Sequence, residues 1–490
     1  MTWRRNAAPM PAARGPDHAF LRDIFRYFQQ NGSCMMARTV AILGAGPVGL
    51  AAAAHVLERG MRPLILEQGI AVGHSVREWG HVPMFSNWRF NIDAAAERRL
   101  KHAGWQAPDP EAHPTGAELV EGYLEPLGQT LAPWLRLGRH ILAVSREGID
   151  KVKDAGPVTA PFVIETEGPT GDERYHADAV IDATGTWFQP NPGGSGRPVR
   201  GEMGHLRISY GMPDVAGRER ERYSGKRAAV LGGGHSAIGT LIALSGLPGT
   251  TALWLCRAPT TARALGGGAG DQLAARGALG TDMARLVDSG SIRLESGFHL
   301  AAVEGSTPLT AVSADGRHIE VDELVIATGF RPDLSFLREL RVALDPALEC
   351  PPALAPLIDP NLHSCGTVRP HGAAELAHPE PGFYIAGMKS YGRAPTFLLA
   401  TGHEQVRSIV AAIAGDHEAA ARVELVLPET GVCSGPGPRA AKAVTATCCG
   451  GPALTRADAC CAADEAAKDS GASGCGCGTS AEPVKAAACC

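Results

Sequence analysis

Two glycine-rich turns in the sequence have the residue types and spacing that hold the pyrophosphate of a dinucleotide. Residues 40–49 read VAILGAGPVG and residues 228–237 read AAVLGGGHSA, so in each copy an apolar strand runs into a glycine turn and opens a helix. In the first copy, Gly44 permits the tight turn, Gly46 lets the backbone approach a pyrophosphate, and Gly49 lets the helix pack closely on the sheet. The free N–H groups at the start of that helix favour the phosphates. We therefore predict a dinucleotide site at these three glycines.

A carboxylate follows the first turn at the distance that such a site requires. The next apolar segment, residues 63–67, reads PLILE and ends in Glu67. An acid about 20 residues beyond the glycines bonds the ribose hydroxyls and favours a nucleotide with a free 2′-hydroxyl, such as FAD or NAD. A chance glycine turn would not bring the strand, the helix, the second strand and Glu67 together. We assign FAD to this first turn.

The second turn differs from the first in a way that favours another nucleotide. Gly232 and Gly234 hold the first two positions, and Ala237 is the small third residue. The next apolar segment, residues 251–256, is followed by Arg257 instead of an acid. A guanidinium at this point suits a 2′-phosphate and favours NADPH over NADH, whereas the alternative is an ordinary solvated arginine. Two dinucleotides in one chain are what a flavin needs to receive hydride from a nicotinamide.

Three further strands must position these turns. Residues 179–185 read AVIDATG and residues 323–329 read ELVIATG, so both are apolar runs that end in Ala-Thr-Gly. The first precedes the second glycine turn, and the second follows that turn by about the length of a domain. They mark the points where the chain crosses between two domains. Residues 382–387 read GFYIAG and form a late strand that brings Gly387 to the flavin. We therefore predict an α/β fold with two Rossmann-like dinucleotide-binding domains, the second inserted into the first.

The domain boundaries follow from these motifs. We predict an N-terminal extension without regular structure (1–36), an FAD-binding domain in two parts (37–190 and 326–425), an inserted NADPH-binding domain (191–325), and a flexible cysteine-rich tail (426–490).

Over about residues 38–420 the chain resembles the flavoproteins with two dinucleotide-binding domains. These include flavin-containing monooxygenases, N-hydroxylating monooxygenases and thioredoxin reductases, so the resemblance implies an FAD- and NADPH-dependent oxidoreductase. Thioredoxin reductases exchange electrons through a Cys-x-x-Cys pair, and no such pair occurs in this sequence.

The monooxygenase branch carries a signature F-x-G-x-x-x-H-x-x-x-Y before the second glycine turn. Gly201 and His205 match it, whereas Val199 replaces the phenylalanine and Tyr210 lies one residue late. This partial match favours a monooxygenase. His205 is also explained as an ordinary histidine of the linker.

One irregular segment in the first domain is a candidate substrate wall. Residues 78–90 read EWGHVPMFSNWRF and combine aromatic and polar side chains with a glycine and a proline, which favour a loop. The loop is expected to cover the flavin ring, although ordinary aromatic packing explains it equally well.

The tail is the second chemical signal. Nine of the thirteen cysteines lie in it, as Cys433, the adjacent pairs Cys448 and Cys449, Cys460 and Cys461, and Cys489 and Cys490, and Cys475 with Cys477. The small and polar residues between them cannot bury enough surface to fold alone. Adjacent thiolates in a flexible chain suit soft ions such as As(III), Sb(III) or Cu(I) better than structural zinc, which favours Cys-x-x-Cys pairs. We predict that these nine cysteines bind As(III) or another thiophilic ion.

Residues 386–407 resemble the flavoproteins encoded in bacterial arsenic-resistance gene clusters. This resemblance implies FAD, NADPH and an arsenic-linked oxidation. The predicted function is oxidation of a soft nucleophile such as a trivalent arsenical, with no catalytic side chain assigned. Two alternatives stay open: an NADPH-dependent flavin reductase acting on a disulfide, quinone or protein partner, and a metalloid-binding protein that acts through its tail.

The composition limits the partners and the compartment. The chain has 490 residues and a net charge of −5, which argues against nucleic acid as a partner. No apolar run approaches the ~20 residues that cross a membrane, and residues 1–36 lack the apolar core of a signal peptide. We expect a cytoplasmic enzyme with a small-molecule substrate.

Overall fold

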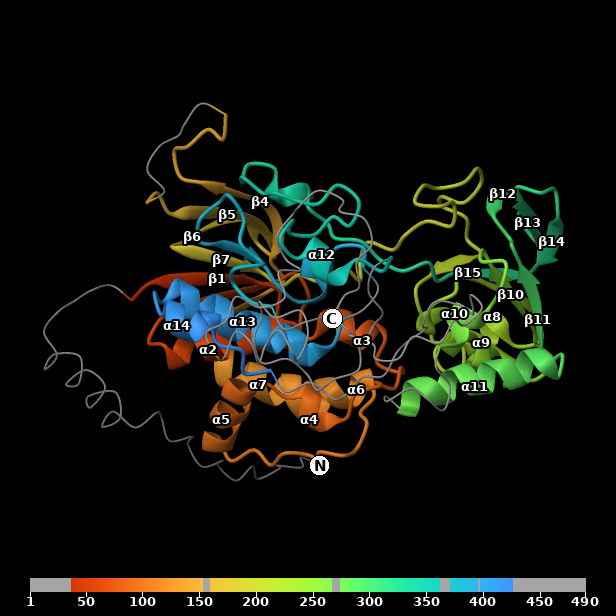
Figure 1. Ribbon diagram of the computed structural model, residues 1–490, viewed down its shortest axis with the longest axis horizontal. Coiled ribbons are helices and arrows are strands. Elements are labelled where there is room, and N and C mark those ends of the chain that lie inside the picture. Colours follow the sequence, from red (N-terminus) through yellow and green to blue (C-terminus); the bar gives the residue numbers. More distant parts are fainter. Residues whose placement is uncertain (1–36, 153–158, 267–273, 362–370, 395–396, 426–490) are drawn as a thin grey trace, which may run out of the picture. The chain divides into compact units, whose positions relative to one another are not determined.

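The computed structural model describes residues 37–152, 159–266, 274–361, 371–394 and 397–425 (Figure 1). Within them the chain forms two five-stranded parallel sheets and two three-stranded antiparallel sheets. The predicted 1–36 extension and 426–490 tail lie outside the described residues, and so do all nine cysteines assigned to a thiophilic ion.

The first parallel sheet has the strand order β16-β7-β1-β2-β3. Its strands are β1 (Thr39–Leu43), β2 (Arg62–Glu67), β3 (Leu135–Leu137), β7 (Ala179–Asp182) and β16 (Phe383–Ile385). Val40 and Ile42 of β1 pack on helices, among them α2 (Pro47–Glu58) and α13 (Leu399–Ile413). Ala41 and Leu43 face the antiparallel strands β4 (His140–Arg146), β5 (Phe162–Gly168) and β6 (Gly171–Ala177). Both faces of β1 are therefore buried, which explains its unbroken apolar sequence.

The second parallel sheet repeats this plan. Its order is β11-β10-β9-β15-β8. The strands are β8 (Ile208–Tyr210), β9 (Arg227–Leu231), β10 (Thr251–Cys256), β11 (Ile292–Ser296) and β15 (Glu323–Ile326). Val230 packs on α9 (His235–Ser245) and α11 (Ala274–Asp288), whereas Leu231 faces β12 (Leu300–Gly305), β13 (Leu309–Ser313) and β14 (His318–Val321). Each domain is thus a parallel sheet with helices on one face and an antiparallel sheet on the other (Figure 1).

The chain makes the second domain between two neighbouring strands of the first sheet. Strands β7 and β16 pair in parallel, and β8 to β15 lie between them in the sequence. The first Ala-Thr-Gly run follows β7 and the second follows β15. This topology confirms the predicted α/β fold in which one dinucleotide-type domain is inserted into the other.

Short helices complete the described part of the chain. They are α3 (His74–Glu78), α4 (Trp88–Asn91), α5 (Ala94–His102), α6 (Gly116–Leu119), α7 (Glu125–Leu131), α8 (Arg220–Tyr223), α10 (Ala262–Leu265), α12 (Ala355–Ile358) and α14 (His417–Ala421). A π-helical turn, η1 (Val120–Leu124), joins α6 to α7, and the 3₁₀ turns are η2 (Ala132–Trp134), η4 (Ser335–Leu337) and η5 (Gly387–Tyr391).

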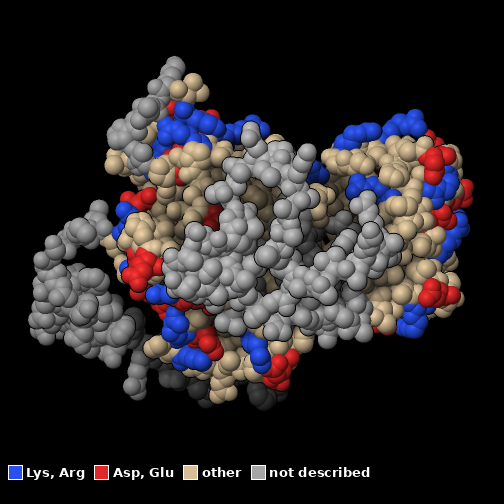
Figure 2. Space-filling view, in the orientation of Figure 1, with Lys and Arg blue, Asp and Glu red and all other residues tan. Residues whose placement is uncertain are grey.

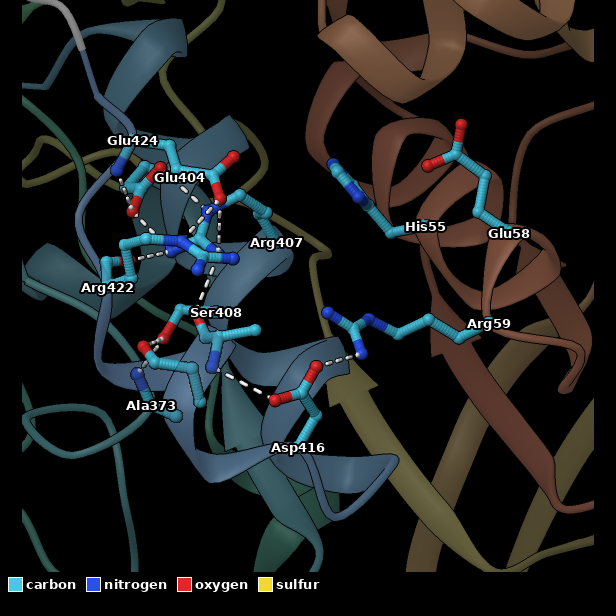
Figure 3. A network of polar contacts seen from close by, with 12 residues as sticks. His55, Glu58, Arg59, Ala373, Glu404, Arg407, Ser408, Asp416, Arg422 and Glu424 are labelled. Carbon is cyan, nitrogen blue, oxygen red and sulfur yellow. Dashed lines mark hydrogen bonds and ion pairs between the residues drawn. The ribbon is translucent and has the colours of Figure 1, made fainter.

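A polar network fastens the last described segment to α13 (Figure 3). The Arg407 guanidinium lies 2.6 Å from Glu404 Oε1, and the same carboxylate accepts the backbone N–H of Glu424 at 3.1 Å. Ser408 donates its hydroxyl to the carbonyl of Ala420 at 2.6 Å. On α2, Arg59 pairs with Asp416 at 3.0 Å. The described chain therefore ends in a segment that is held by side chains of two core helices.

Charged side chains of both signs lie on the face shown in Figure 2. Among the described residues, ion pairs at the surface include Arg98 with Glu58 and Arg174 with Glu165. Exposed pairs contribute little stability each, so the free energy of folding comes mainly from the buried apolar clusters. Among the described helices, none combines the length and the apolar character that spanning a membrane demands.

Candidate dinucleotide-binding sites

The first glycine turn is built so that only one of its glycines faces open space. Gly44 has a φ of +99°, and a Cβ there would lie 2.8 Å from the carbonyl oxygen of Ala183. A Cβ on Gly49 would lie 2.0 Å from the carbonyl oxygen of Gly44, whereas a Cβ on Gly46 would meet no atom of the described residues within 4 Å. Gly44 and Gly49 are therefore needed for packing inside the protein. The space next to Gly46, at the N-terminus of α2, fits a pyrophosphate.

Glu67 is the buried last residue of β2 and faces the same turn. Its Oε2 accepts the N–H of Ala45 at 2.7 Å, and its Oε1 accepts the N–H of Gly69 at 2.8 Å. A carboxylate has about four acceptor positions, so these two bonds leave capacity for two ribose hydroxyls. The residues of this first site fit FAD, because they combine an open turn for the pyrophosphate with a carboxylate for the ribose.

Gly387 lies beside the same helix N-terminus. It has a φ of +71°, and a Cβ there would lie 3.2 Å from Val48 Cγ2 in the first turn of α2. Its N–H donates to Oε1 of Gln405 on α13 at 2.8 Å, and Gln405 also donates to the hydroxyl of Ser390 at 2.9 Å. The end of β16 therefore reaches the first glycine turn. Gln405 is a buried contributor that we did not identify from the sequence.

The second glycine turn has the same construction. A Cβ on Gly232 would lie 2.3 Å from the carbonyl oxygen of Ala327 and 3.3 Å from the Cβ of Ala237, whereas a Cβ on Gly234 would meet no atom within 4 Å. Ala327 belongs to the second Ala-Thr-Gly run, as Ala183 belongs to the first. Each of these runs therefore packs against the first glycine of its own sheet. The open residue, Gly234, lies directly before α9.

Arg257 directly follows β10 and is exposed. Within the described part of the chain, no carboxylate forms an ion pair with it, in contrast to Arg293 on β11, which pairs with Glu295 at 2.6 Å. A free guanidinium at this edge of the second sheet is suited to bind a nucleotide 2′-phosphate.

The partial monooxygenase signature forms a connected structural unit. A Cβ on Gly201 would lie 2.0 Å from the carbonyl oxygen of Val303, and His205 Nε2 lies 3.1 Å from the carbonyl oxygen of Gly305. Tyr210 donates to the buried carboxylate of Glu202 at 3.0 Å, and burial together with this contact raises the pKa of Tyr210. These residues join the linker to β8 and β12, as expected if His205 is an ordinary linker histidine.

The candidate substrate wall divides into two parts. Residues 79–87 lie between α3 and α4, as expected for a loop, and Pro83 forms an isolated bridge to Thr115. Trp88 is the first residue of α4 and is buried in the core of the first domain. Packing therefore accounts for Trp88, while a role in substrate binding stays a prediction for the loop before it.

The described residues hold no group of three or more histidine, cysteine or acidic side chains that would form a metal site. Cys256 and Cys350, which the structure describes, are both buried and unpaired. Burial raises the pKa of each thiol, to about 12 for Cys350, so neither is a reactive thiolate near neutral pH.

Comparison with solved structures agrees with the two-domain architecture. The chain is similar to the bacillithiol disulfide reductase Bdr (YpdA) from Bacillus cereus, with 20% identity, a TM-score of 0.59, and coverage of 78% of this chain and 99% of that one. Bdr (YpdA) from Staphylococcus aureus gives 18% identity, a TM-score of 0.55 and coverage of 78% and 99%. A flavin-containing monooxygenase from Stenotrophomonas maltophilia gives 20% identity, a TM-score of 0.48, and coverage of 78% of this chain and 99% of that one. No curated protein matches the chain.

The family comparison gives a more specific result than the likeness to the two Bdr structures, which shows the fold alone. The model of the pyridine nucleotide-disulphide oxidoreductase family matches residues 41–351, from β1 through both glycine turns to the end of the inserted domain and beyond. FAD and a nicotinamide dinucleotide are the cofactors typical of that family. With an open glycine turn in each of its two sheets, the chain belongs to the pyridine nucleotide-disulphide oxidoreductase family and is an FAD-dependent oxidoreductase.

Proposed function

We propose that the protein is an FAD- and NADPH-dependent monooxygenase that oxidises a soft nucleophile, such as a trivalent arsenical, and thereby contributes to arsenic resistance. The observation that carries the proposal is the pair of open glycine turns, one with the buried Glu67 and the other with Arg257, which has no ion-pair partner among the described residues. The chain has no Cys-x-x-Cys pair, and its two described cysteines are buried. This supports oxygen transfer over electron transfer through a disulfide.

Each element of the site has a part in this chemistry. Bound FAD would supply the redox centre that takes hydride from NADPH and activates O₂. Gly46 and Gly234 admit the two pyrophosphates, Glu67 holds the ribose of FAD, and Arg257 selects the phosphorylated nicotinamide cofactor. The lone pair of As(III) or sulfur receives one oxygen atom of O₂. The other oxygen atom leaves as water, with two electrons from NADPH and protons from NADPH and solvent.

The proposed reaction does not require a nucleophilic side chain from the protein. The substrate brings its own lone pair, so the protein has to hold the two dinucleotides and exclude water, and a general base is not required. The cysteine-rich tail adds a second part to the proposal. Its nine thiols would gather As(III), because two or three thiolates on one ion bind such a soft centre tightly.

The reaction is tested with purified protein, NADPH and a choice of arsenite, methylarsenite or a thioether. We expect the substrate to stimulate the oxidation of NADPH, with one O₂ consumed and one oxygenated product formed for each NADPH. The measurements are NADPH absorbance, an oxygen electrode, and separation of As(III) from As(V). Substrate-dependent oxidation of NADPH by a disulfide or a quinone without O₂ consumption would instead establish the reductase alternative.

Arg257→Asp tests the choice of nicotinamide cofactor. We expect the KM for NADPH to rise about 10-fold or more, because a hydrogen bond to a charged group contributes roughly 1.5–3 kcal/mol. The KM for NADH should change little. Arg285→Asp is a matched control, since it makes the same charge change on the exposed surface of α11. A wild-type protein that uses NADPH and NADH equally well would contradict the role of Arg257.

A further inference from the structure

A completely buried ion pair lies at the carboxyl edge of the first sheet. The Lys389 ammonium lies 2.6 Å from Asp182 Oδ2, and both side chains have 0% exposure. Lys389 also donates to the hydroxyl of Thr184 at 2.9 Å, and this hydroxyl donates to Asp182 Oδ1 at 2.7 Å. The ring of Phe336 lies 4.4 Å from the ammonium. The three polar side chains therefore form a closed triangle in which each contacts the other two.

This triangle joins the two segments that border the first glycine turn. Asp182 is the last residue of β7, and the next residue, Ala183, contacts Gly44 through its carbonyl. Lys389 belongs to η5, whose first residue, Gly387, packs against Val48 at the start of α2. Both segments therefore lie beside the first glycine turn, one at Gly44 and the other at the start of α2. The ion pair links these two segments directly.

The second sheet provides an internal comparison. Leu43 of β1 pairs in register with Asp182, and in the second sheet the corresponding Leu231 of β9 pairs with Ile326. The same corner of the same architecture is therefore filled there by an apolar side chain. A buried ion pair is often no more stable than well-packed apolar residues in its place. Apolar packing at this corner is therefore compatible with the same architecture, which makes a role in cofactor binding a reasonable hypothesis for Asp182 and Lys389.

We propose that Lys389 is a positioning residue for FAD, which sets the geometry of the first glycine turn through Asp182 and Thr184. It acts on the segments that hold the dinucleotide and is not assigned to the oxygen-transfer chemistry. The inference rests on FAD at the first site. It is independent of the substrate, because cofactor binding alone reports on it.

The test uses two variants of the full chain, prepared without flavin and titrated with FAD while the quenching of flavin fluorescence is followed. In K389M the carboxylate of Asp182 is left buried without its cation. D182I/K389M gives this corner the apolar character of the second sheet. We expect both variants to bind FAD about 10- to 100-fold more weakly, by analogy with the loss of metal affinity when the partners that orient metal ligands are removed. We expect the unfolding temperature of the flavin-free double variant to equal or exceed that of the flavin-free wild type, because apolar residues often replace a buried ion pair without loss of stability.

Arg146→Met is the matched control, because Arg146 forms a similarly buried pair with Glu380 at 2.9 Å, with exposures of 7% and 3%. It should lower the unfolding temperature while the Kd for FAD stays within about twofold of the wild-type value. T184V removes the hydroxyl that contacts both Asp182 and Lys389 and should also weaken the binding of FAD. This variant tests the proposal if K389M does not fold. The proposal is overturned if D182I/K389M binds FAD with the Kd of the wild type, or if Arg146→Met weakens FAD binding as much as K389M does. A protein that binds FAD in this pattern but transfers no oxygen would contradict only the proposed function.

Discussion

Gly46→Val is expected to give a folded protein that lacks FAD and is colourless. A Cβ at this position would meet no atom of the described residues within 4 Å, and the backbone there, with φ −80° and ψ −174°, is allowed for valine. The isopropyl group would occupy the space through which a pyrophosphate approaches the N–H groups of α2. Loss of two bonds to a charged group corresponds to roughly 3–6 kcal/mol, or at least about a 100-fold loss of affinity. Flavin absorbance and the far-ultraviolet circular dichroism of the same sample check the result.

The matched variant of the second turn is Gly234→Val, because a Cβ at Gly234 would also meet no atom of the described residues within 4 Å. It should stay yellow, because the first turn is intact, but NADPH should no longer reduce its flavin. Gly49→Val should behave differently from both and fail to fold stably, since its Cβ would lie 2.0 Å from a carbonyl oxygen. A Gly46→Val protein with a full complement of FAD would refute the assignment of the first turn.

Truncation after Gly431 is expected to abolish tight As(III) binding and to leave the reduction of FAD by NADPH intact. The cut removes all nine tail cysteines. It keeps Glu404, Arg407 and Glu424, the network that fastens the end of the described chain to α13 (Figure 3). The core should therefore unfold at an unchanged temperature. Binding is measured by equilibrium dialysis and arsenic analysis, and reduction by anaerobic bleaching of the flavin.

The control for the truncation is a full-length variant with the nine tail cysteines changed to serine, which separates the loss of thiols from the loss of chain. Both proteins should bind As(III) equally weakly, and cells that carry either one should tolerate arsenite less well. If the wild type binds no more As(III) than the truncated protein, the metalloid-binding role of the tail is wrong. If truncation stops the reduction of the flavin, the tail takes part in electron transfer.

The features that the sequence predicted well are those that local geometry requires. A tight turn after a strand needs Gly44, a close helix needs Gly49, and the two Ala-Thr-Gly runs mark the crossings between domains. Each requirement involves a few neighbouring residues, so it leaves a pattern at fixed spacing. The family match and the parallel sheets confirm the two-domain fold that these patterns predicted.

The partial signature around His205 did not predict the contacts that its residues make in the structure. Its spacing favoured a monooxygenase, yet in the structure His205 contacts the backbone of Gly305 and Tyr210 contacts Glu202. Glu202 had no place in the pattern, although it accepts the N–H groups of Gly193 and Val199 at 2.8 Å each. Residue types at a given spacing do not specify which partners they contact, whether the partner is near in the sequence, as Glu202 is to Tyr210, or on another strand, as Gly305 is for His205.

The sequence by itself identified the two glycine turns, the acid after the first and the arginine after the second, because each of these residues stands at a fixed spacing from an apolar strand. Only the tertiary structure decided what supports them. Lys389 meets Asp182 across 207 positions of sequence, and Gln405 reaches Gly387 from another helix. Those contacts exist because the chain leaves the first sheet after β7, folds a whole domain, and returns beside it as β16. Such long-range contacts form only when the complete chain is folded, so no periodicity or spacing along the sequence predicts them.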